Sequence, residues 1–329
     1  MLKVTVAGDR LRFGSQFGIS FQRTLRIPDD GREYPLPPGL GAFPLRRVAD
    51  HAARVPAAWR ERGGVFLPMY QREAMWLSFE VPSGRPCAVK IAVGKVNAIS
   101  GEPWDERLVP GRQDYLVCPD QPWLDGINAG EGFIRQFVAM PLGMGYTVEG
   151  QVTGKEEFGG VQIVVYRAKP GRFPRRPRRS GRIYGDADFC LCCCDVGVDM
   201  GLGAGGRLRQ EIYPDPHGVD TWDTANTARC FVHLANSCAW RDITGEEPPA
   251  TPVSAASYTA SGLPWFDLYD EGLGELAPSP VLAGVKSVKE MDAQQGFAPQ
   301  QDDATVEIGA GQVVGLAVPA GEAVADGQW

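Results

Sequence analysis

Alternation of apolar and polar residues is the main pattern in the first half of the chain. Residues 88–93 place branched apolar side chains on one side of an extended chain and Lys90 on the other, which is the period of a half-buried strand. Glycine-rich connections that are too short for crossover helices separate such segments, so we expect antiparallel pairing. The predicted strands are residues 88–93, 133–140, 146–152 and 161–166.

The second half contains further extended segments. Residues 189–198 and 207–213 predict strands, whereas the apolar run 229–234 fits either a strand or a buried helix. Near the C-terminus, residues 305–308 and 312–318 predict a final hairpin.

Three segments are predicted to be helical. Residues 45–62 place charged side chains opposite apolar ones, with Pro56 breaking or restarting the helix and Gly63 ending it. The other two helices have signals at both ends. Their N-caps and terminal glycines are Thr251 (followed by Pro252) with Gly262, and Ser287 (in a capping box with Glu290) with Gly296.

Glycine and proline are abundant, with 41 and 27 residues, and both end helices and shape turns. Together with the alternation they predict a mainly β fold: an antiparallel sandwich or distorted barrel with a few peripheral helices. Prolines and closely spaced arginines make residues 169–182 an exposed loop or linker. It separates a β-rich N-terminal half with one helix, residues 1–168, from a β-rich C-terminal half with two short helices, residues 183–329.

The chain of 329 residues is acidic, with a net charge of −7 and a pI near 5.2. This balance gives no general attraction to nucleic acid or anionic lipid. No stretch reaches the ~18 apolar residues of a membrane-spanning helix, and residues 1–9 alternate like a strand instead of forming an apolar secretory signal. We therefore expect a cytoplasmic protein with free cysteines and no contact with a membrane.

Cysteines cluster in one segment that is expected to be a strand. The four are Cys190, Cys192, Cys193 and Cys194. Downstream residues that could complete a tetrahedral zinc site with them are Cys230, His233 and Cys238. A strand places alternate cysteines on one face, whereas zinc needs paired cysteines on a tight turn. We expect buried thiols and no metal, and the zinc alternative stays open.

Two glycine motifs resemble nucleotide sites only in part. Residues 201–206 match Gly-x-Gly-x-x-Gly, but Pro214 and Pro216 leave no room for the helix that would receive a pyrophosphate. We expect a flexible turn between strands there. The Gly154-Lys155 pair lacks the first glycine and the Ser/Thr of a P-loop, so no cofactor is expected.

Hydrolytic motifs are also missing, since the chain has neither Gly-x-Ser-x-Gly nor His-Glu-x-x-His. Of the three histidines, His51 is expected on a surface helix and His217 in a proline-rich loop. His233 lies in an apolar segment, where we favour a hydrogen-bonded core histidine over a general base.

Tryptophans stand beside carboxylates in four segments that are expected to be loops. A flat indole with nearby oxygens can bind a sugar ring, and two carboxylates at a suitable separation could hydrolyse a glycoside. Tryptophans in such loops also commonly cover the ends of a β core. The candidate ligand-binding residues are Trp104, Trp123, Trp222, Trp265, Glu102, Asp105, Asp125 and Asp223.

The arginine-rich loop is a second candidate contact region. Guanidinium groups bind phosphates and Phe173 could stack on a base, although the acidic balance of the whole chain argues against a polyanion partner. The arginines concerned are Arg172, Arg175, Arg176, Arg178 and Arg179.

Residues 134–149, IRQFVAMPLGMGYTVE, and residues 262–267, GLPWFD, carry a resemblance. They resemble a family of uncharacterised microbial proteins over most of the chain. The resemblance implies no activity and no site residues.

No complete catalytic arrangement is visible in the sequence. We therefore expect a non-enzymatic protein that binds a ligand or self-associates through aromatic loops or strand edges. The alternative is a carbohydrate-active hydrolase that uses paired carboxylates from Glu102, Asp105, Asp125 and Asp223.

Overall fold

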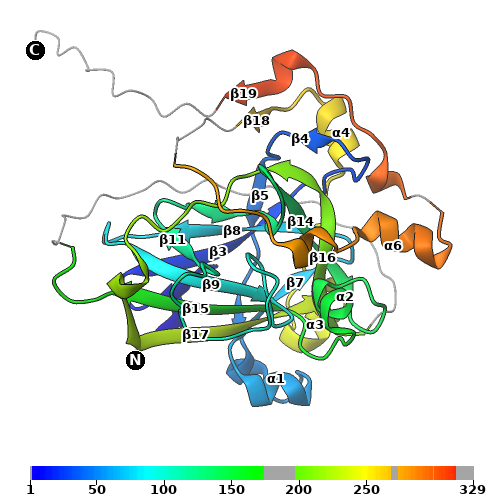
Figure 1. The fold of residues 1–329 in the computed structure, drawn as a ribbon. Coiled ribbons are helices and arrows are strands. Elements are labelled where there is room, and N and C mark those ends of the chain that lie inside the picture. The colour runs from blue at the N-terminus through cyan, green and yellow to red at the C-terminus, as the bar shows by residue number, and fades with distance from the viewer. Residues whose placement is uncertain (1, 174–196, 268–272, 299, 316–329) are drawn as a thin grey trace, which may run out of the picture.

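Backbone pairing joins strands from both halves of the chain into one long sheet (Figure 1). The computed structural model describes residues 2–173, 197–267, 273–298 and 300–315. Within these ranges 17 strands form the large sheet, and two more form a small parallel one. Neighbours in the large sheet are antiparallel apart from two parallel pairs. The expected antiparallel pairing is thus confirmed.

One half of the large sheet contains the N-terminal strands. Its strands pair in the order β1 (Val4–Val6), β2 (Leu11–Phe13), β3 (Phe17–Thr24), β8 (Ala74–Glu80), β14 (Phe133–Pro141) and β16 (Asp199–Arg209). Short strands beside them are β4 (Glu33–Tyr34), β5 (Gly39–Ala42), β12 (Trp123–Leu124) and β13 (Gly126–Gly130).

The other half is built around β17 (Trp222–Asn236), which also pairs with the start of β16. From β17 it continues through β15 (Val161–Ala168) to β9 (Cys87–Val93), which pairs with β10 (Val96–Asn97) and β11 (Leu116–Cys118). Flanking the C-terminal part of β17 are β7 (Val65–Met69) and β6 (Arg46–Arg47). The separate pair is β18 (Trp265–Asp267) with β19 (Val313–Gly315).

Side chains from both halves of the large sheet form the main apolar core. Phe13 of β2 and Phe21 of β3 are fully buried in the same cluster as Ile91 of β9 and Ile163 of β15, which belong to the other half of the sheet. Each such side chain contributes about 1.5–3 kcal/mol by leaving water. The expected mainly β, sandwich-like fold with a few helices is confirmed, and the described strands do not close into a barrel.

Three strand predictions are confirmed, since residues 88–93, 133–140 and 161–166 fall inside β9, β14 and β15. The expectation that β9 is half-buried is wrong. Lys90 has no exposed surface and pairs with Asp114 Oδ2 at 2.9 Å. Its Nζ also donates to the carbonyl of Asp105 at 2.8 Å. The loop that follows β10 covers this face of the strand. Lys90 therefore contacts Asp114 and the Asp105 carbonyl in place of the water that the alternating pattern predicted around it.

Residues 146–152 form a helix and not the predicted strand. The helix α2 (Val148–Thr153) begins where the Thr147 side chain accepts a hydrogen bond from the amide of Gly150. Val148 and Val152 are four residues apart, so they lie on one side of a helix as readily as on one side of a strand. The short pattern could not separate the two structures.

The glycine-rich residues 201–206 lie inside β16, so the predicted flexible turn is wrong. A Cβ atom at Gly206 would lie 2.4 Å from the carbonyl oxygen of Pro28, and one at Gly203 would lie 2.8 Å from that of Tyr146. Glycine is required here because other backbone segments approach the strand closely. The predicted strand over 207–213 ends at Arg209.

Helices lie around the sheet, and several are shorter than predicted. They are α1 (Ala57–Arg62), α2, α3 (Ser237–Thr244), α4 (Ala255–Ala260), α5 (Pro280–Ala283) and α6 (Val288–Gln295), with 3-10 turns η1 (Val48–His51), η2 (Val219–Thr221), η3 (Gln301–Asp303) and η4 (Ala310–Gln312). Sequence analysis did not predict α3 or α5. The described residues contain no helix long and apolar enough to cross a membrane.

The ends of the predicted helices have mixed outcomes. Within 45–62, the restart at Pro56 and the end at Gly63 are confirmed, but the first part forms β6 and η1. The helix predicted from Thr251 begins at its actual N-cap, Ser254. The capping box that starts α6 is confirmed.

The predicted C-terminal hairpin is wrong for the described residues. β19 pairs in parallel with β18, whereas residues 305–308 form no strand. β19 pairs with β18, a segment distant in the sequence, and not with the neighbouring segment that a hairpin would supply. Residues 316–318 lie outside the described ranges, as do residues 189–196 of the predicted cysteine-containing strand.

Candidate functional site

A cleft of about 550 Å³ lies along one edge of β17. β15 pairs with one side of β17 from Trp222 to Val232, whereas β7 pairs with the other side only from Val232 onward. Among the described strands, none pairs with that second side at Arg229, Cys230 and Phe231, and these residues line the cleft. The site is therefore built on a free strand edge.

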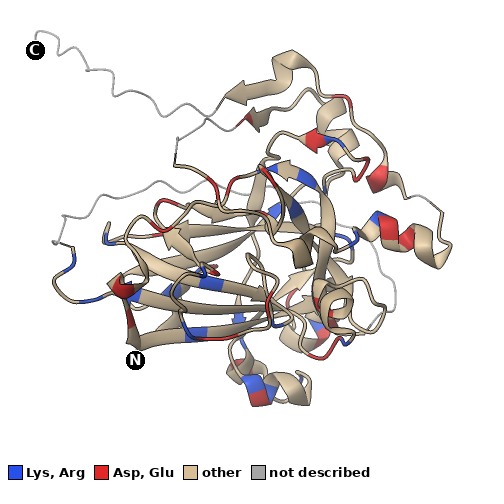
Figure 2. Ribbon diagram, viewed as in Figure 1, with Lys and Arg blue, Asp and Glu red and all other residues tan. Residues whose placement is uncertain are grey.

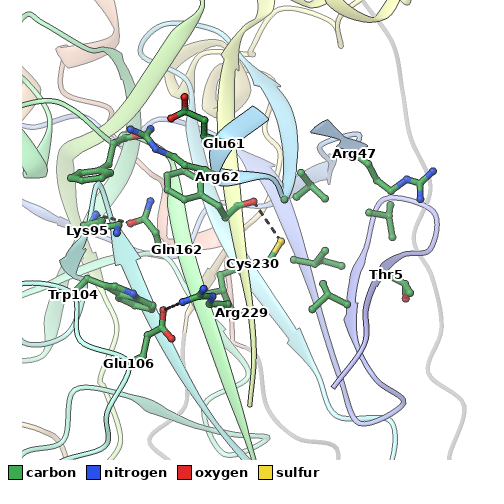
Figure 3. A pocket seen from close by; sticks show the side chains of 18 residues that line it. Thr5, Arg47, Glu61, Arg62, Lys95, Trp104, Glu106, Gln162, Arg229 and Cys230 are labelled. Atoms are coloured by element: carbon green, nitrogen blue, oxygen red, sulfur yellow. Dashed lines mark hydrogen bonds and ion pairs between the residues drawn. The ribbon is translucent and has the colours of Figure 1, made fainter. Parts of the chain in front are cut away.

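Two cations, Arg62 and Lys95, and two aromatic rings line the cleft (Figure 3). The Arg62 guanidinium lies 4.9 Å from the ring centroid of Phe158 and 5.5 Å from that of Phe231. Lys95 Nζ lies 4.7 Å from the Phe158 centroid. Cation–π contacts of this kind hold both charges over ring faces.

The backbone fixes the positions of the two cations. Arg62 ends α1 and donates hydrogen bonds to the carbonyls of Glu157, at 3.0 Å, and Phe158, at 3.3 Å. Lys95 lies in the turn between β9 and β10 with φ of 62°, and its amide donates to Gln162 Oε1 at 2.6 Å. A left-handed residue other than glycine is uncommon and marks a constrained turn. In the described part of the chain, no carboxylate forms an ion pair with Arg62 or Lys95.

The loop that carries Phe158 is held by a buried carboxylate. Glu149 of α2 accepts hydrogen bonds from the backbone amides of Glu157, Phe158 and Gly159 at 2.8–2.9 Å. Three amides that donate to one carboxylate form a strong, directional contact. Glu149 thus orders the surface on which Arg62 and Lys95 rest.

Behind Phe231 lies a buried aromatic stack. The Phe231 ring stacks on His233 at 4.3 Å between centroids, and His233 stacks on Trp59 at 4.7 Å. Burial lowers the pKa of His233 to about 4, so its imidazole is neutral at pH 7. The expectation of a core histidine is confirmed by its 1% exposure and its 3.0 Å contact with the Gly63 carbonyl.

Of the remaining polar groups in the cleft, Glu61 is exposed, whereas Glu106 is paired and the Cys230 thiol is neutral. Glu106 accepts from Arg229 Nη1 at 2.6 Å, and both side chains are partly exposed. Burial raises the pKa of the Cys230 thiol to about 12, which suppresses the reactive thiolate. Figure 3 shows that thiol turned toward the N-terminal strands, away from Arg229 and Lys95.

Of the tryptophans nominated from the sequence, Trp104 lines the cleft. Its amide donates to the Lys95 carbonyl at 2.8 Å, so the loop after β10 packs over the cationic side. Trp222 lies in a buried cluster against which Trp104 packs. Trp265 lies in the main core and Trp123 in β12, half-buried. The nominated tryptophans thus do not form one surface.

The nominated carboxylates occupy different environments and do not line the cleft. Glu102 is exposed, and the Arg107 side chain lowers the pKa of Asp105 by hydrogen bonding. Asp223 pairs with Arg167 at 3.4 Å. Burial raises the pKa of Asp125 to about 7, and its Oδ2 has no hydrogen-bond partner in the structure.

The arginine-rich loop is described only at its start. Arg172 is exposed, and Phe173 meets His217 edge-on with 5.0 Å between ring centroids. The other nominated arginines, Arg175, Arg176, Arg178 and Arg179, lie outside the described residues, as do Cys190, Cys192, Cys193 and Cys194. Within the described ranges, no three His, Cys, Asp or Glu side chains gather closely enough to hold a metal ion.

Sequence analysis missed the cationic residues of the cleft. Arg62 was only the last residue of the predicted helix 45–62, and Lys95 received no role. Gly94-Lys95 between two alternating segments was the available signal, because such a pair marks a tight turn that presents its side chain. Comparisons with protein-family models, with curated proteins and with solved structures found no match to this chain.

Proposed function

We propose that this protein is a non-enzymatic binding protein that holds a small anionic ligand in the cleft beside β17. The observation that carries the proposal is the placement of Arg62 and Lys95 on one phenyl ring, Phe158, with no direct ion pair to a carboxylate among the described residues. Both cations line the same cleft, and charges of the same sign repel each other. A bound anion would remove this repulsion and add charge-assisted hydrogen bonds.

The charge of the cleft also supports an anion. Four basic and two acidic side chains line it, an excess of two positive charges in a chain whose net charge is −7. Figure 2 shows basic and acidic residues interspersed over the strands and helices, with both signs on α6. A local positive site in an acidic protein favours a small anion over a polyanion.

A binding role fits the cleft better than a catalytic one. Its thiol, Cys230, is held neutral, and Glu106 is engaged by Arg229. The hydrolase alternative needs two carboxylates facing one open cleft, and the carboxylates nominated for it do not line this one.

Titration calorimetry with inorganic pyrophosphate tests the proposal. We expect one site per chain, with a dissociation constant that rises with salt because the contacts are ionic. Replacing both cations, Arg62→Gln with Lys95→Gln, should weaken binding at least about tenfold, since each lost contact is worth roughly 1.5–3 kcal/mol.

The matched control removes two exposed cations outside the cleft, Arg54→Gln with Lys169→Gln. It changes the net charge equally and should leave the affinity within about twofold of that of the unaltered protein, because distant exposed charges are screened. Equal weakening in both double variants, or no saturable binding to the unaltered protein, would rule out this site.

A further inference from the structure

We propose that the ligand is an anionic amphiphile, whose carboxylate or phosphate head contacts Arg62 and Lys95 and whose unbranched aliphatic tail crosses the free edge of β17 toward β1. This inference rests on the proposed function, because it names the ligand class for the same cleft. The two sides of that strand edge differ in polarity.

The side of the cleft that faces the N-terminal strands is mainly apolar, although Thr5 and Arg47 also lie there (Figure 3) and Arg47 pairs with Asp50. Its apolar lining residues are Val4, Val6, Leu11, Val65, Ile163 and Cys230. Val4, Val6 and Cys230 are partly buried and pack against the main core. Apolar groups brought to this surface would leave water and contact the core directly.

The aliphatic tail would lie between the facing edges of β1 and β17, here called the seam. β1 pairs with β2 through Val4–Val6, and none of the described strands pairs with its other side. β17 has the same free side at Arg229, Cys230 and Phe231. Both unpaired edges border the cleft, and a tail without hydrogen-bonding groups can lie along them.

Alternating side chains of β17 define the two halves of the ligand site. Figure 3 shows Cys230 turned to the side of the N-terminal strands, whereas Arg229, Lys95, Gln162 and Trp104 lie on the opposite side. Because neighbouring residues of a strand point to opposite faces, its edge separates an apolar from a cationic surface. A ligand that touches both surfaces must itself have an apolar and an anionic part.

Affinity as a function of chain length tests the inference. Butyrate and octanoate, and butyl and octyl phosphate, are compared by calorimetry, with octanol as the uncharged reference. Each buried methylene tightens binding about fourfold, so for the preferred head the eight-carbon ligand should bind at least about tenfold tighter than its four-carbon homologue. Octanol should bind at least about tenfold more weakly than the better eight-carbon anion, because it cannot make the charge-assisted contacts.

A bulky residue in the seam separates this inference from the proposed function. Val6→Phe fills the apolar side and should reduce the eight-carbon advantage to less than about threefold while pyrophosphate affinity is retained. Val4→Phe serves the same purpose if the first variant does not fold. Thr224→Phe, at an exposed position of β17 outside the cleft, is the matched control and should preserve the chain-length effect.

The outcomes distinguish two failures. Pyrophosphate binding without a chain-length effect in either pair would overturn the amphiphile and leave the anion site standing. Absence of pyrophosphate binding and of octanoate and octyl phosphate binding would remove both. Octanol binding as tightly as the eight-carbon anions, or a concentration-dependent dimer that they fail to dissociate, would also overturn the amphiphile.

Discussion

At the scale of single residues, His233 illustrates how position changes chemistry. The imidazole is stacked between Phe231 and Trp59, and its Nδ1 is buried without a hydrogen-bond partner in the structure. Burial disfavours the charged form, which lowers the pKa from 6.5 to about 4. Between about pH 4 and pH 6.5, His233 is therefore neutral in the folded protein but protonated in the unfolded chain.

This difference predicts a dependence of stability on pH. Below pH 6.5 the unfolded chain binds a proton at His233 that the folded chain refuses until about pH 4, so the free energy of unfolding falls as pH drops through this window. The loss approaches about 3 kcal/mol for a shift of this size. His233→Phe keeps an aromatic ring in the stack and should remove this part of the slope in urea unfolding measured from pH 7 to pH 4.

His51→Phe removes a histidine outside that stack and provides the control. It retains His233 and should therefore retain the contribution of His233 to the slope. Buried acids with raised pKa values, such as Asp199 at about 6, act in the opposite direction in every variant. Parallel curves for the unaltered protein and His233→Phe would contradict the prediction.

At the scale of elements, β16 shows that glycine in a strand can be a packing requirement. Gly206→Ala adds a methyl group that would lie 2.4 Å from the Pro28 carbonyl and 2.9 Å from that of Ile27. Backbone atoms cannot move aside cheaply, so we expect a loss of about 1–3 kcal/mol in the free energy of unfolding. Chemical denaturation measures it.

Gly197→Ala is the matched control for this strand prediction. A Cβ atom there meets no other atom within 4 Å, and the substitution should change stability by no more than about 0.5 kcal/mol. If the two variants are equally stable, close approach is not the reason for glycine in β16.

At the scale of the whole molecule, ion pairs fasten the C-terminal segment to the sheet. Arg72 contacts Asp292, Asp302 and Asp303 at 2.7–3.0 Å, and Arg26 contacts Asp302 and Asp303. The Asp303 side chain is only 1% exposed. Removing a partner from such a buried group leaves an uncompensated charge, which is far more costly than losing a surface pair.

Arg72→Met should therefore destabilise the protein by about 3 kcal/mol and increase proteolytic cleavage in residues 287–315. Arg32→Met is the control, since Arg32 pairs with Glu307 at 2.8 Å but both side chains are more than half exposed. Its cost should stay below about 1 kcal/mol. Unfolding in urea with limited proteolysis measures both, and equal losses would refute a role for burial.

Local chemistry in the sequence determined the strands β9, β14 and β15, the restart at Pro56 and the capping box of α6, because their signals involve residues only a few positions apart. Tertiary contacts decided the rest. Lys90 was expected to be solvated but is buried, because a loop covers it. Residues 201–206 were expected to form a turn but lie in a strand, where neighbouring backbone packs closely against the glycines.

The candidate site depends even more on tertiary structure. Arg62, Lys95, Phe158 and Phe231 come from four separate segments of the chain, and no spacing along the chain relates them. Trp104 was the exception, because a tryptophan beside carboxylates in a loop is a local signal. Sequence thus determined which segments become strands, whereas the unpaired edge of β17, which makes the cleft, exists only once distant strands have paired or failed to pair.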